Sequence, residues 1–251
     1  MTTWLDPLRR ALDTAPAPVS IFFRADDGGW ANDALFALLD LFASHTLPLD
    51  VAVIPQALTS SLAQELRTRV SRTPALVRLH QHGFAHTNHE STGRKCEFGP
   101  ARLKADQQRD IEWGRRQLHE LLGPTVDPIF TPPWNRCTTE TGECLRTLGF
   151  RLLSRDATAV PLAIAGLGEL PISVDWFAQR KGARLPREEF GVLLAATVTP
   201  AKPLGIMFHH AMMDAEEHAA ANDLLAVLAT HPQVACRSMR ALTDTASEPR
   251  H

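Results

Sequence analysis

Two adjacent carboxylates and two closely spaced histidines give this chain of 251 residues side chains suited to metal-assisted proton transfer. Asp26 and Asp27 follow a short apolar run, where one carboxylate can bind a cation while the other takes a proton from the water on that cation. Three residues separate His82 from His86, which predicts two imidazoles on one side of a helical turn, able to chelate one divalent ion. The two pairs together predict a metal site with a base beside it.

The remaining histidines of interest lie close to these pairs or near the end of the chain. Six of the eleven histidines fall within residues 80–89 and 209–210, whereas the chain has no tyrosine. We expect His80 to support the ligands from behind rather than to bind the ion. Asn88 is expected to hydrogen-bond either a ligand or its own turn. Only one of His209 and His210 needs to face the site, because neighbouring side chains diverge along a strand.

Two further segments offer groups that a reaction needs beside its metal. Prolines 132 and 133 stiffen the approach to Trp134 and present the following backbone N–H groups as donors for an oxyanion. Asp175 can orient a histidine, and the absence of tyrosine leaves Trp134 and Trp176 as the expected aromatic lining. The side chains that we expect to contact a substrate are Arg24, His80, Asn88, Asn135, Arg136, Trp176 and His210.

The elements that position these groups alternate between strands and helices. Short apolar runs predict strands, and runs with apolar residues at helical spacing predict helices. This alternation is typical of a parallel sheet with helices outside it, either a barrel or a doubly wound sheet, in which sites form at the carboxyl ends of the strands. The predicted strands are 19–24, 49–54, 75–79, 128–131, 151–154, 171–174, 204–208 and 234–236, and the predicted helices are 31–44, 60–70, 100–122, 140–148, 187–196 and 214–230.

Composition is that of an ordinary folded chain, with 44% hydrophobic and 22% charged residues. The net charge of −2 argues against a nucleic-acid partner, and no apolar run is long enough to cross a membrane. Without an export signal in the sequence, we expect a cytoplasmic protein with four free thiols. No linker divides the chain, so we expect a single catalytic domain over residues 1–251, with a short helical lead-in at 1–18.

The order of these motifs resembles that of the polysaccharide deacetylase family (NodB-homology, carbohydrate esterase family 4), of which the chain looks like a divergent member. The family's Thr-Phe-Asp-Asp-Gly motif is matched by residues 24–28, its His-x-x-x-His motif by His82 and His86, and its Arg-Pro-Pro-aromatic-Gly motif by residues 131–135. Its Asp-Trp and Leu-x-His motifs are matched by residues 175–176 and 207–209, so the resemblance covers residues 19–237.

The resemblance implies a distorted (β/α) barrel with about seven parallel strands and a hydrolase that removes an N-acetyl or related acyl group from a small-molecule or oligosaccharide substrate. It implies one divalent metal ion, with zinc as the first choice, held by Asp27, His82 and His86. It also implies that Asp26 is the general base and His209 the general acid, and that the Trp134 N–H helps to hold the oxyanion. Without an export signal, a soluble sugar derivative is a better candidate substrate than an extracellular polymer.

The chain departs from the family pattern in its third motif, where Thr131 replaces the arginine that partners the base and Asn135 replaces the glycine. Arg24 and Arg136 are the candidates to take over from that arginine. Two alternative hypotheses remain. An amidohydrolase-like barrel would use His80 and His82 as a His-x-His ligand pair, and a non-catalytic relative would keep its metal but only bind a sugar.

Overall fold

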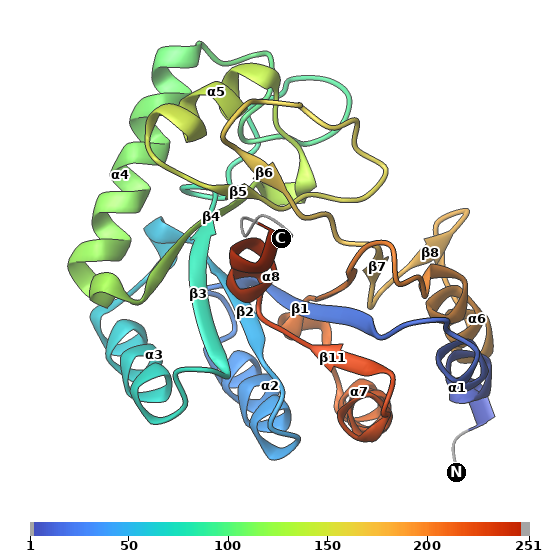
Figure 1. Ribbon diagram of the computed structural model, residues 1–251. Helices are drawn as coiled ribbons and strands as arrows, with labels where there is room; N and C mark the ends of the chain where they lie inside the picture. The colour runs from blue at the N-terminus through green and yellow to red at the C-terminus, as the bar shows by residue number, and fades with distance from the viewer. Residues whose placement is uncertain (1–2, 247–251) are drawn as a thin grey trace.

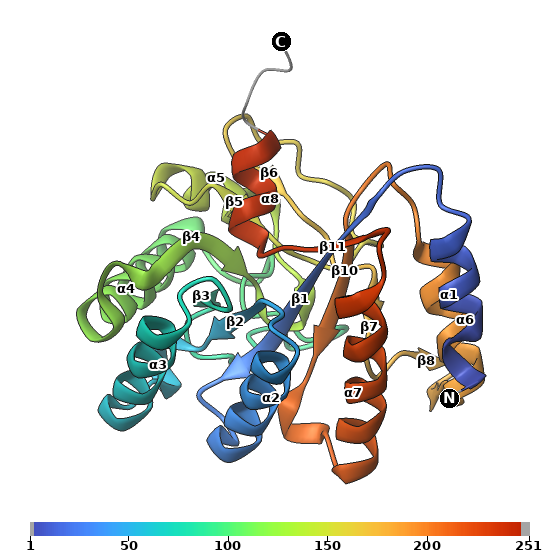
Figure 2. The same ribbon diagram turned by 60° about the horizontal axis from the view of Figure 1, so that its bottom comes forward.

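A curled sheet of parallel strands forms the centre of the fold, with helices packed on its outer face (Figures 1 and 2). A computed structural model describes residues 3–246. The strand order is β6-β5-β4-β3-β2-β1-β10-β7, with β11 also paired to β1, and every pairing in this sheet is parallel. Because β6 and β7 do not pair within the described residues, the barrel is distorted and incompletely closed. The predicted α/β barrel is therefore confirmed, with nine strands in this sheet rather than about seven.

Most predicted strands lie where the apolar runs placed them, but several are short. The third strand begins later than expected and includes His80 and His82. No apolar run predicted β6 or the small antiparallel hairpin of β8 and β9, and each of these strands has two residues. The strands are β1 (Val19–Gly28), β2 (Leu49–Val53), β3 (Val77–His82), β4 (Val126–Thr131), β5 (Leu152–Leu153), β6 (Gly168–Glu169), β7 (Val174–Asp175), β8 (Gln179–Arg180), β9 (Ala183–Arg184), β10 (Leu204–Phe208) and β11 (Val234–Cys236).

The helices agree with the periodic runs, and several begin at a side chain that caps them. Thr59 and Asp214 each accept a hydrogen bond from a backbone N–H in the first turn of the helix that follows, which is why these helices begin there. Among residues 3–246, no helix combines the length and the apolar character that crossing a membrane requires. The helices are α1 (Asp6–Asp13), α2 (Asn32–Ser44), α3 (Ser60–Arg72), α4 (Lys104–Leu122), α5 (Thr139–Thr147), α6 (Arg187–Thr197), α7 (Ala215–Thr230) and α8 (Met239–Ala246).

Alternation along β1 assigns its side chains to two different surroundings. Ile21 and Phe23 face outward into the main apolar core shared with the surrounding helices. Phe22 belongs instead to a smaller apolar cluster inside the barrel. Continuing the same alternation, Arg24 and Asp26 also point inward, toward the carboxyl end of the sheet. The inward face of β1 is therefore apolar near its amino end, at Phe22, and polar near its carboxyl end, at Arg24 and Asp26.

At the opposite end of the barrel, α8 lies over the sheet (Figure 2). Charged side chains are buried there. The backbone N–H of Met239, at the start of α8, donates to Asp50 Oδ2 over 2.9 Å. Arg78 pairs with Asp127 on the neighbouring strand. Burial, together with the nearby Asp127 carboxylate, raises the pKa of Asp50 to about 7.

This raised pKa predicts a pH-dependent contribution of Asp50 to stability. Because the folded state retains the Asp50 proton after the unfolded chain has lost it, the free energy of unfolding should fall as pH rises from about 4 to about 7. Asp50→Asn, which mimics the protonated carboxyl, should remove that part of the fall. Urea unfolding of both proteins across this pH range measures the difference, and parallel pH profiles would contradict the assignment.

Candidate active site

A cavity of about 540 Å³ opens at the carboxyl ends of the parallel strands. Most of the polar residues singled out from the sequence line it, although they come from five different strand ends and loops. The lining residues among those predicted are Asp26, Asp27, His82, His86, Trp134, Asn135, Arg136, Asp175 and His209. The sequence motifs thus converge on one cavity, as expected for the ends of parallel strands.

Three donor atoms in this cavity are close enough to share one ion. Asp27 Oδ1 lies 3.3 Å from His82 Nε2 and 3.2 Å from His86 Nε2, and the three residues offer ligand atoms that all lie within 4.8 Å of one another. Ligands at about 2.0–2.2 Å from a tetrahedral zinc ion are roughly 3.3 Å apart, so these separations suit a shared divalent ion. One carboxylate oxygen and two imidazole nitrogens also suit zinc and its neighbours in the first transition row.

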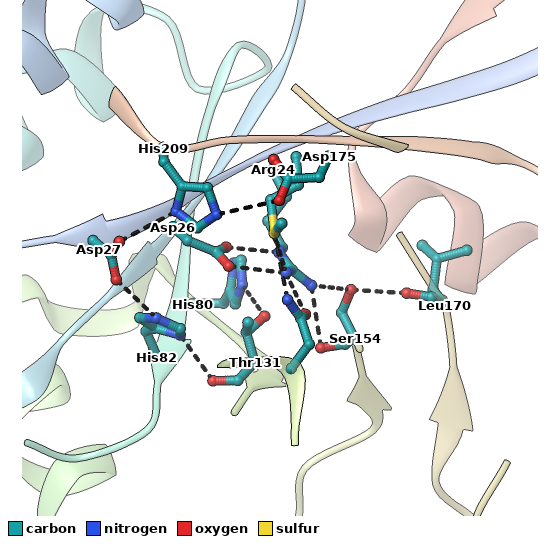
Figure 3. A network of polar contacts seen from close by, with 12 residues as sticks. Arg24, Asp26, Asp27, His80, His82, Thr131, Ser154, Leu170, Asp175 and His209 are labelled. Atoms are coloured by element: carbon teal, nitrogen blue, oxygen red, sulfur yellow. Dashed lines mark hydrogen bonds and ion pairs between the residues drawn. The ribbon is translucent and has the colours of Figure 1, made fainter. Parts of the chain in front are cut away.

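A hydrogen bond on the far side of the ring orients His82. Its Nδ1 lies 3.0 Å from the Thr131 carbonyl oxygen, which can only accept, so Nδ1 donates and Nε2 is the nitrogen directed at Asp27 that could bind an ion (Figure 3). His82 is the last residue of β3 and is buried. The neighbouring strand β4 therefore sets the imidazole orientation that ligation requires.

His86 reaches the same point by a route that the spacing did not predict. Residues 83–89 form no helix, so the expected helical turn is wrong. Gly83 and His86 instead adopt left-handed backbone conformations, with φ of 55° at both. The His86 ring lies between Trp30 and Trp134, at centroid distances of 4.8 and 4.5 Å. A tight loop and two indole rings, rather than helical periodicity, place this imidazole.

Glu97 holds that loop in place from beneath. Its carboxylate is almost fully buried and accepts the backbone N–H groups of Phe84 and Ala85, over 3.3 and 2.7 Å. A Cβ on Gly83 would lie only 2.2 Å from Glu97 Oε2, so only a glycine allows this close approach. Glu97 is therefore a positioning residue for His86, and no local sequence signal indicated it.

Glu97→Gln should weaken metal binding without unfolding the protein. The amide replaces one acceptor oxygen with a donor, so one of the two loop N–H groups loses its partner and His86 is held less firmly. Loss of such outer support typically reduces metal affinity by about 10–100-fold. Competition with a chromophoric zinc chelator measures the change, and Glu120→Gln on the exposed face of α4 is the control. Equal zinc affinity in both variants would contradict this role.

Arg24 pairs with Asp26, although the third motif has Thr131 at its arginine position. Its guanidinium makes a two-pronged ion pair with Asp26, with Nε to Oδ1 at 2.7 Å and Nη2 to Oδ2 at 2.9 Å (Figure 3). Both residues lie on β1, two positions apart, and both are buried. Arg24 also donates to the Ser154 carbonyl and hydroxyl oxygens and to Asn135 Oδ1. Arg136, the other candidate, makes no ion pair with Asp26 and instead donates to the Lys95 carbonyl oxygen.

The ion pair fixes the protonation state of Asp26. Burial opposes ionisation, but the guanidinium of Arg24 and the nearby imidazoles of His82 and His209 hold the pKa of Asp26 below its ordinary value. Behind it, His80 is buried and bonds the Thr131 hydroxyl over 2.9 Å. Burial and the charge of Arg24 lower the pKa of His80 to about 3, so His80 is a neutral support and does not line the cavity.

Removing Arg24 should therefore destabilise the fold through Asp26. Arg24→Met leaves a buried carboxylate without a counter-charge, which typically costs about 3–5 kcal/mol. In an Asp26→Asn background the same substitution should cost clearly less, because no charge is left unpaired. Urea unfolding of the four proteins of this double-mutant cycle gives the coupling energy. Additive costs would show that the two side chains do not act as a pair.

His209 lies between two carboxylates of the cavity wall. Its Nδ1 is 3.3 Å from Asp27 Oδ2, and its Nε2 is 3.9 Å from Asp175 Oδ2 (Figure 3). Burial alone would lower the pKa of His209, but Asp27, Asp26 and Asp175 together raise it to about 9. Burial also raises the pKa of Asp175 above its ordinary value. The carboxylates around His209 therefore favour its protonated form, while Arg24 favours the ionised form of Asp26.

Five of the seven predicted substrate contacts do not line the cavity: Arg24 and His80, described above, and Trp176, His210 and Asn88. The indole of Trp176 is buried, stacks on Phe208 and donates to Glu217 Oε2 over 2.6 Å, so its expected place in the aromatic lining is wrong. His210 is buried and bonds the Trp30 carbonyl oxygen, while His209 is the member of the pair that lines the cavity. Asn88 bonds backbone groups of its own loop, the second of the two roles left open.

Other lining residues had no sequence signal. The loops after β3 and β5 contribute side chains to the cavity wall, and Met207 enters from β10 with its sulfur 3.0 Å from Arg24 Nη2. Nothing in the composition of residues 94 and 156–159 shows that they fold over the strand ends. The lining residues that the sequence did not indicate are Arg94, Asp156, Thr158, Ala159 and Met207.

Known proteins with the same architecture are found among solved structures. No family model matches the sequence, and no curated protein is similar to it. Among solved structures, a protein from Mycobacterium smegmatis assigned to the polysaccharide deacetylases superposes with a TM-score of 0.65 at 15% identity, covering 95% of this chain and 97% of that one. A family 4 acetyl xylan esterase from Clostridium thermocellum, in complex with a cobalt ion, gives 0.60 at 14% identity, covering 92% and 93%.

A family 4 pseudoenzyme from Bacillus anthracis has the same fold, with a TM-score of 0.60 at 11% identity over 90% of this chain and 66% of that one. At these identities the likeness concerns the fold, and it agrees with the resemblance seen in the order of the motifs. The chain therefore has the distorted barrel fold of the polysaccharide deacetylases and family 4 carbohydrate esterases.

Proposed function

We propose that this protein is a metal-dependent hydrolase that removes an N-acetyl or related acyl group from a small carbohydrate-type substrate, and that the chain works as a single catalytic domain. One observation carries the proposal. A single cavity holds an Asp–His–His donor set, formed by Asp27, His82 and His86, beside a separate carboxylate, Asp26, that an arginine keeps ionised. Ligand and base are thus distinct groups, as metal-assisted hydrolysis requires.

Asp27, His82 and His86 would hold one divalent ion, with zinc as the first choice. When bound, such an ion polarises the acyl oxygen and makes water a better nucleophile. Three protein ligands leave room for substrate and water, which suits a catalytic rather than a structural site. The orientation of His82 by the Thr131 carbonyl and of His86 by its loop keeps the donor set assembled.

The proton transfers fall to two groups that both line the cavity. Asp26, ionised at neutral pH, takes the proton of the attacking water, and Arg24 holds its carboxylate in place. His209, protonated at neutral pH, gives a proton to the leaving nitrogen, and Asp175 supports its charge. The Trp134 backbone N–H donates to the developing oxyanion from a left-handed turn with φ of 56°.

Two alternatives receive less support from the same geometry. A two-metal, amidohydrolase-like site needs His80 as a ligand, but His80 is buried behind the cavity and bonds Thr131. The hypothesis of a protein that only binds a sugar was based on the missing arginine of the third motif. Arg24 makes an ion pair with Asp26 in place of that arginine, so the hypothesis loses this support. The geometry therefore favours a single-metal hydrolase.

Release of acetate tests the proposal. The zinc-loaded protein should release acetate from at least one member of a panel of N-acetylated mono- and disaccharides, and a chelator should stop the reaction reversibly. The control is the Asp26→Asn variant, which should bind zinc and release no more acetate than the buffer does. A protein that binds zinc and these sugars but releases no acetate from any of them would contradict the proposal in favour of the sugar-binding alternative.

A further inference from the structure

Two arginines stand together on one wall of the cavity. Arg94, from the loop after β3, and Arg136, from the turn after Trp134, both line it. Arg136 Nη1 donates to the Lys95 carbonyl oxygen over 2.8 Å, and the Cys96 thiol donates to the Arg136 carbonyl oxygen, so this turn and the Arg94 loop are bonded to each other. The two arginines line the same cavity, and they are close enough for the charge of Arg94 to lower the pKa of Arg136.

Arg136 is an exception among the arginines of this protein. Every other described arginine that is buried or half-buried contacts a carboxylate or an aromatic ring, whereas Arg136 makes neither contact within residues 3–246. Its Nε is buried and has no hydrogen-bond partner among the described residues. The other pairs are Arg9–Asp6, Arg24–Asp26, Arg69–Glu65, Arg78–Asp127, Arg102–Asp110, Arg115–Phe150, Arg155–Glu169 and Arg187–Glu217.

The electrostatics of this wall favour a bound anion. Burial and the charge of Arg94 both lower the pKa of Arg136, so the protein bears an unfavourable interaction here. Asp156, which also lines the cavity, offsets this interaction in part, but Asp156 Oδ1 already accepts the Thr158 N–H over 2.8 Å and the Thr158 hydroxyl. Neither arginine forms an ion pair with a carboxylate of the described chain. An anion between the two guanidiniums would supply the missing partner.

We propose that Arg94 and Arg136 form a subsite for an anionic group, a carboxylate or a phosphate, carried by the acylated sugar. The inference rests on the proposed function and narrows its substrate class. The same cavity contains the Asp27, His82 and His86 donor set, so one ligand can present its acyl group to these residues and its anion to the arginines. A cavity of about 540 Å³ suits a small sugar derivative. Planar guanidiniums suit carboxylate and phosphate oxygens.

Matched substrates test the subsite. Acetate release is measured with N-acetylglucosamine, its 6-phosphate, and N-acetylmuramic acid, which carries a carboxylate. For at least one anionic sugar, kcat/KM should exceed that of the neutral sugar by about tenfold or more. Arg94→Gln and Arg136→Gln should each remove about tenfold of this advantage, chiefly through KM, and leave the neutral sugar within about twofold. Arg146→Gln, an exposed arginine on α5, is the control. Equal rates for charged and neutral sugars, or equal losses on both, would overturn the inference while leaving the deacetylase proposal intact.

A binding measurement keeps the subsite testable if no sugar is hydrolysed. Calorimetric titration of the zinc-loaded wild type and of Arg136→Gln with N-acetylglucosamine 6-phosphate and with N-acetylmuramic acid should show, for at least one of the two sugars, at least about tenfold weaker binding in the variant. That result would support the subsite even if the proposed hydrolysis failed. Equal binding by the two proteins, or no binding by the wild type to either anionic sugar, would overturn it.

Discussion

Asp26→Asn is expected to leave the zinc content of the protein unchanged and to reduce acetate release by about a thousandfold. General-base catalysis by a positioned side chain typically contributes about 10²–10⁴-fold, and an amide cannot accept the proton. Asp26 is bonded to Arg24 and is not one of the three possible ligands, which are Asp27, His82 and His86. The two functions should therefore separate in this variant.

The comparison needs control variants, because Asp26→Asn also leaves Arg24 without its counter-charge. Unfolding in urea should establish that the variant is folded under assay conditions. Asp33→Asn, an exposed carboxylate in the first turn of α2, should change neither zinc content nor turnover. If Asp26→Asn retained full turnover on a sugar that the wild type hydrolyses, the base would have to be another residue.

Asp27→Ala should have the opposite signature, with metal and activity lost together. Asp27 Oδ1 is the donor atom next to both His82 Nε2 and His86 Nε2, so its removal leaves two imidazoles without the negative ligand between them. We expect zinc affinity to fall by more than the 10–100-fold typical of losing an outer support. Turnover should fall below detection at one equivalent of zinc.

Chelator competition and acetate release on the same samples measure the two losses of Asp27→Ala. Asp33→Ala is the matched control, since it removes an exposed carboxylate at a distance from the donor set. A variant that bound zinc as tightly as the wild type would show that Asp27 is not a ligand. Retained turnover without bound zinc would show that the reaction does not need the ion.

The sheet was predictable because β-strands in a parallel barrel are continuous apolar runs, and the helices between them have a clear period. β10 and β11 have the bounds that the apolar runs indicated. Two-residue strands such as β6 carry no comparable pattern, since their pairing is decided by the strands beside them. The amphipathic helix α8 follows the last predicted strand and was not among the predicted elements.

Within the site, residues on strand ends were predictable and residues on loops were not. Arg24 and Asp26 share one face of β1 because side chains two positions apart on a strand point the same way. That rule could have singled out Arg24 over Arg136 from the sequence alone. The reach of Glu97 back to Phe84 and Ala85 depends on how the intervening loop folds, which no local pattern encodes.

The aromatic residues show the same limit. Trp176 belongs to the interior because Phe208 and Glu217, both distant in sequence, surround it. Trp30, which is 42% exposed and contacts His86, was not among the tryptophans expected to line the site. Counting aromatic residues thus identified which side chains were available, but tertiary contacts decided which of them lie beside the metal ligands.

We propose that hydrolysis needs one metal ion, held by Asp27, His82 and His86. Titration of zinc into chelator-treated protein, followed by acetate release from a sugar that the wild type hydrolyses, tests this requirement. We expect the rate to rise from near zero and to reach its plateau at one equivalent of zinc per chain. Full activity without zinc, or a plateau only at two equivalents, would contradict it.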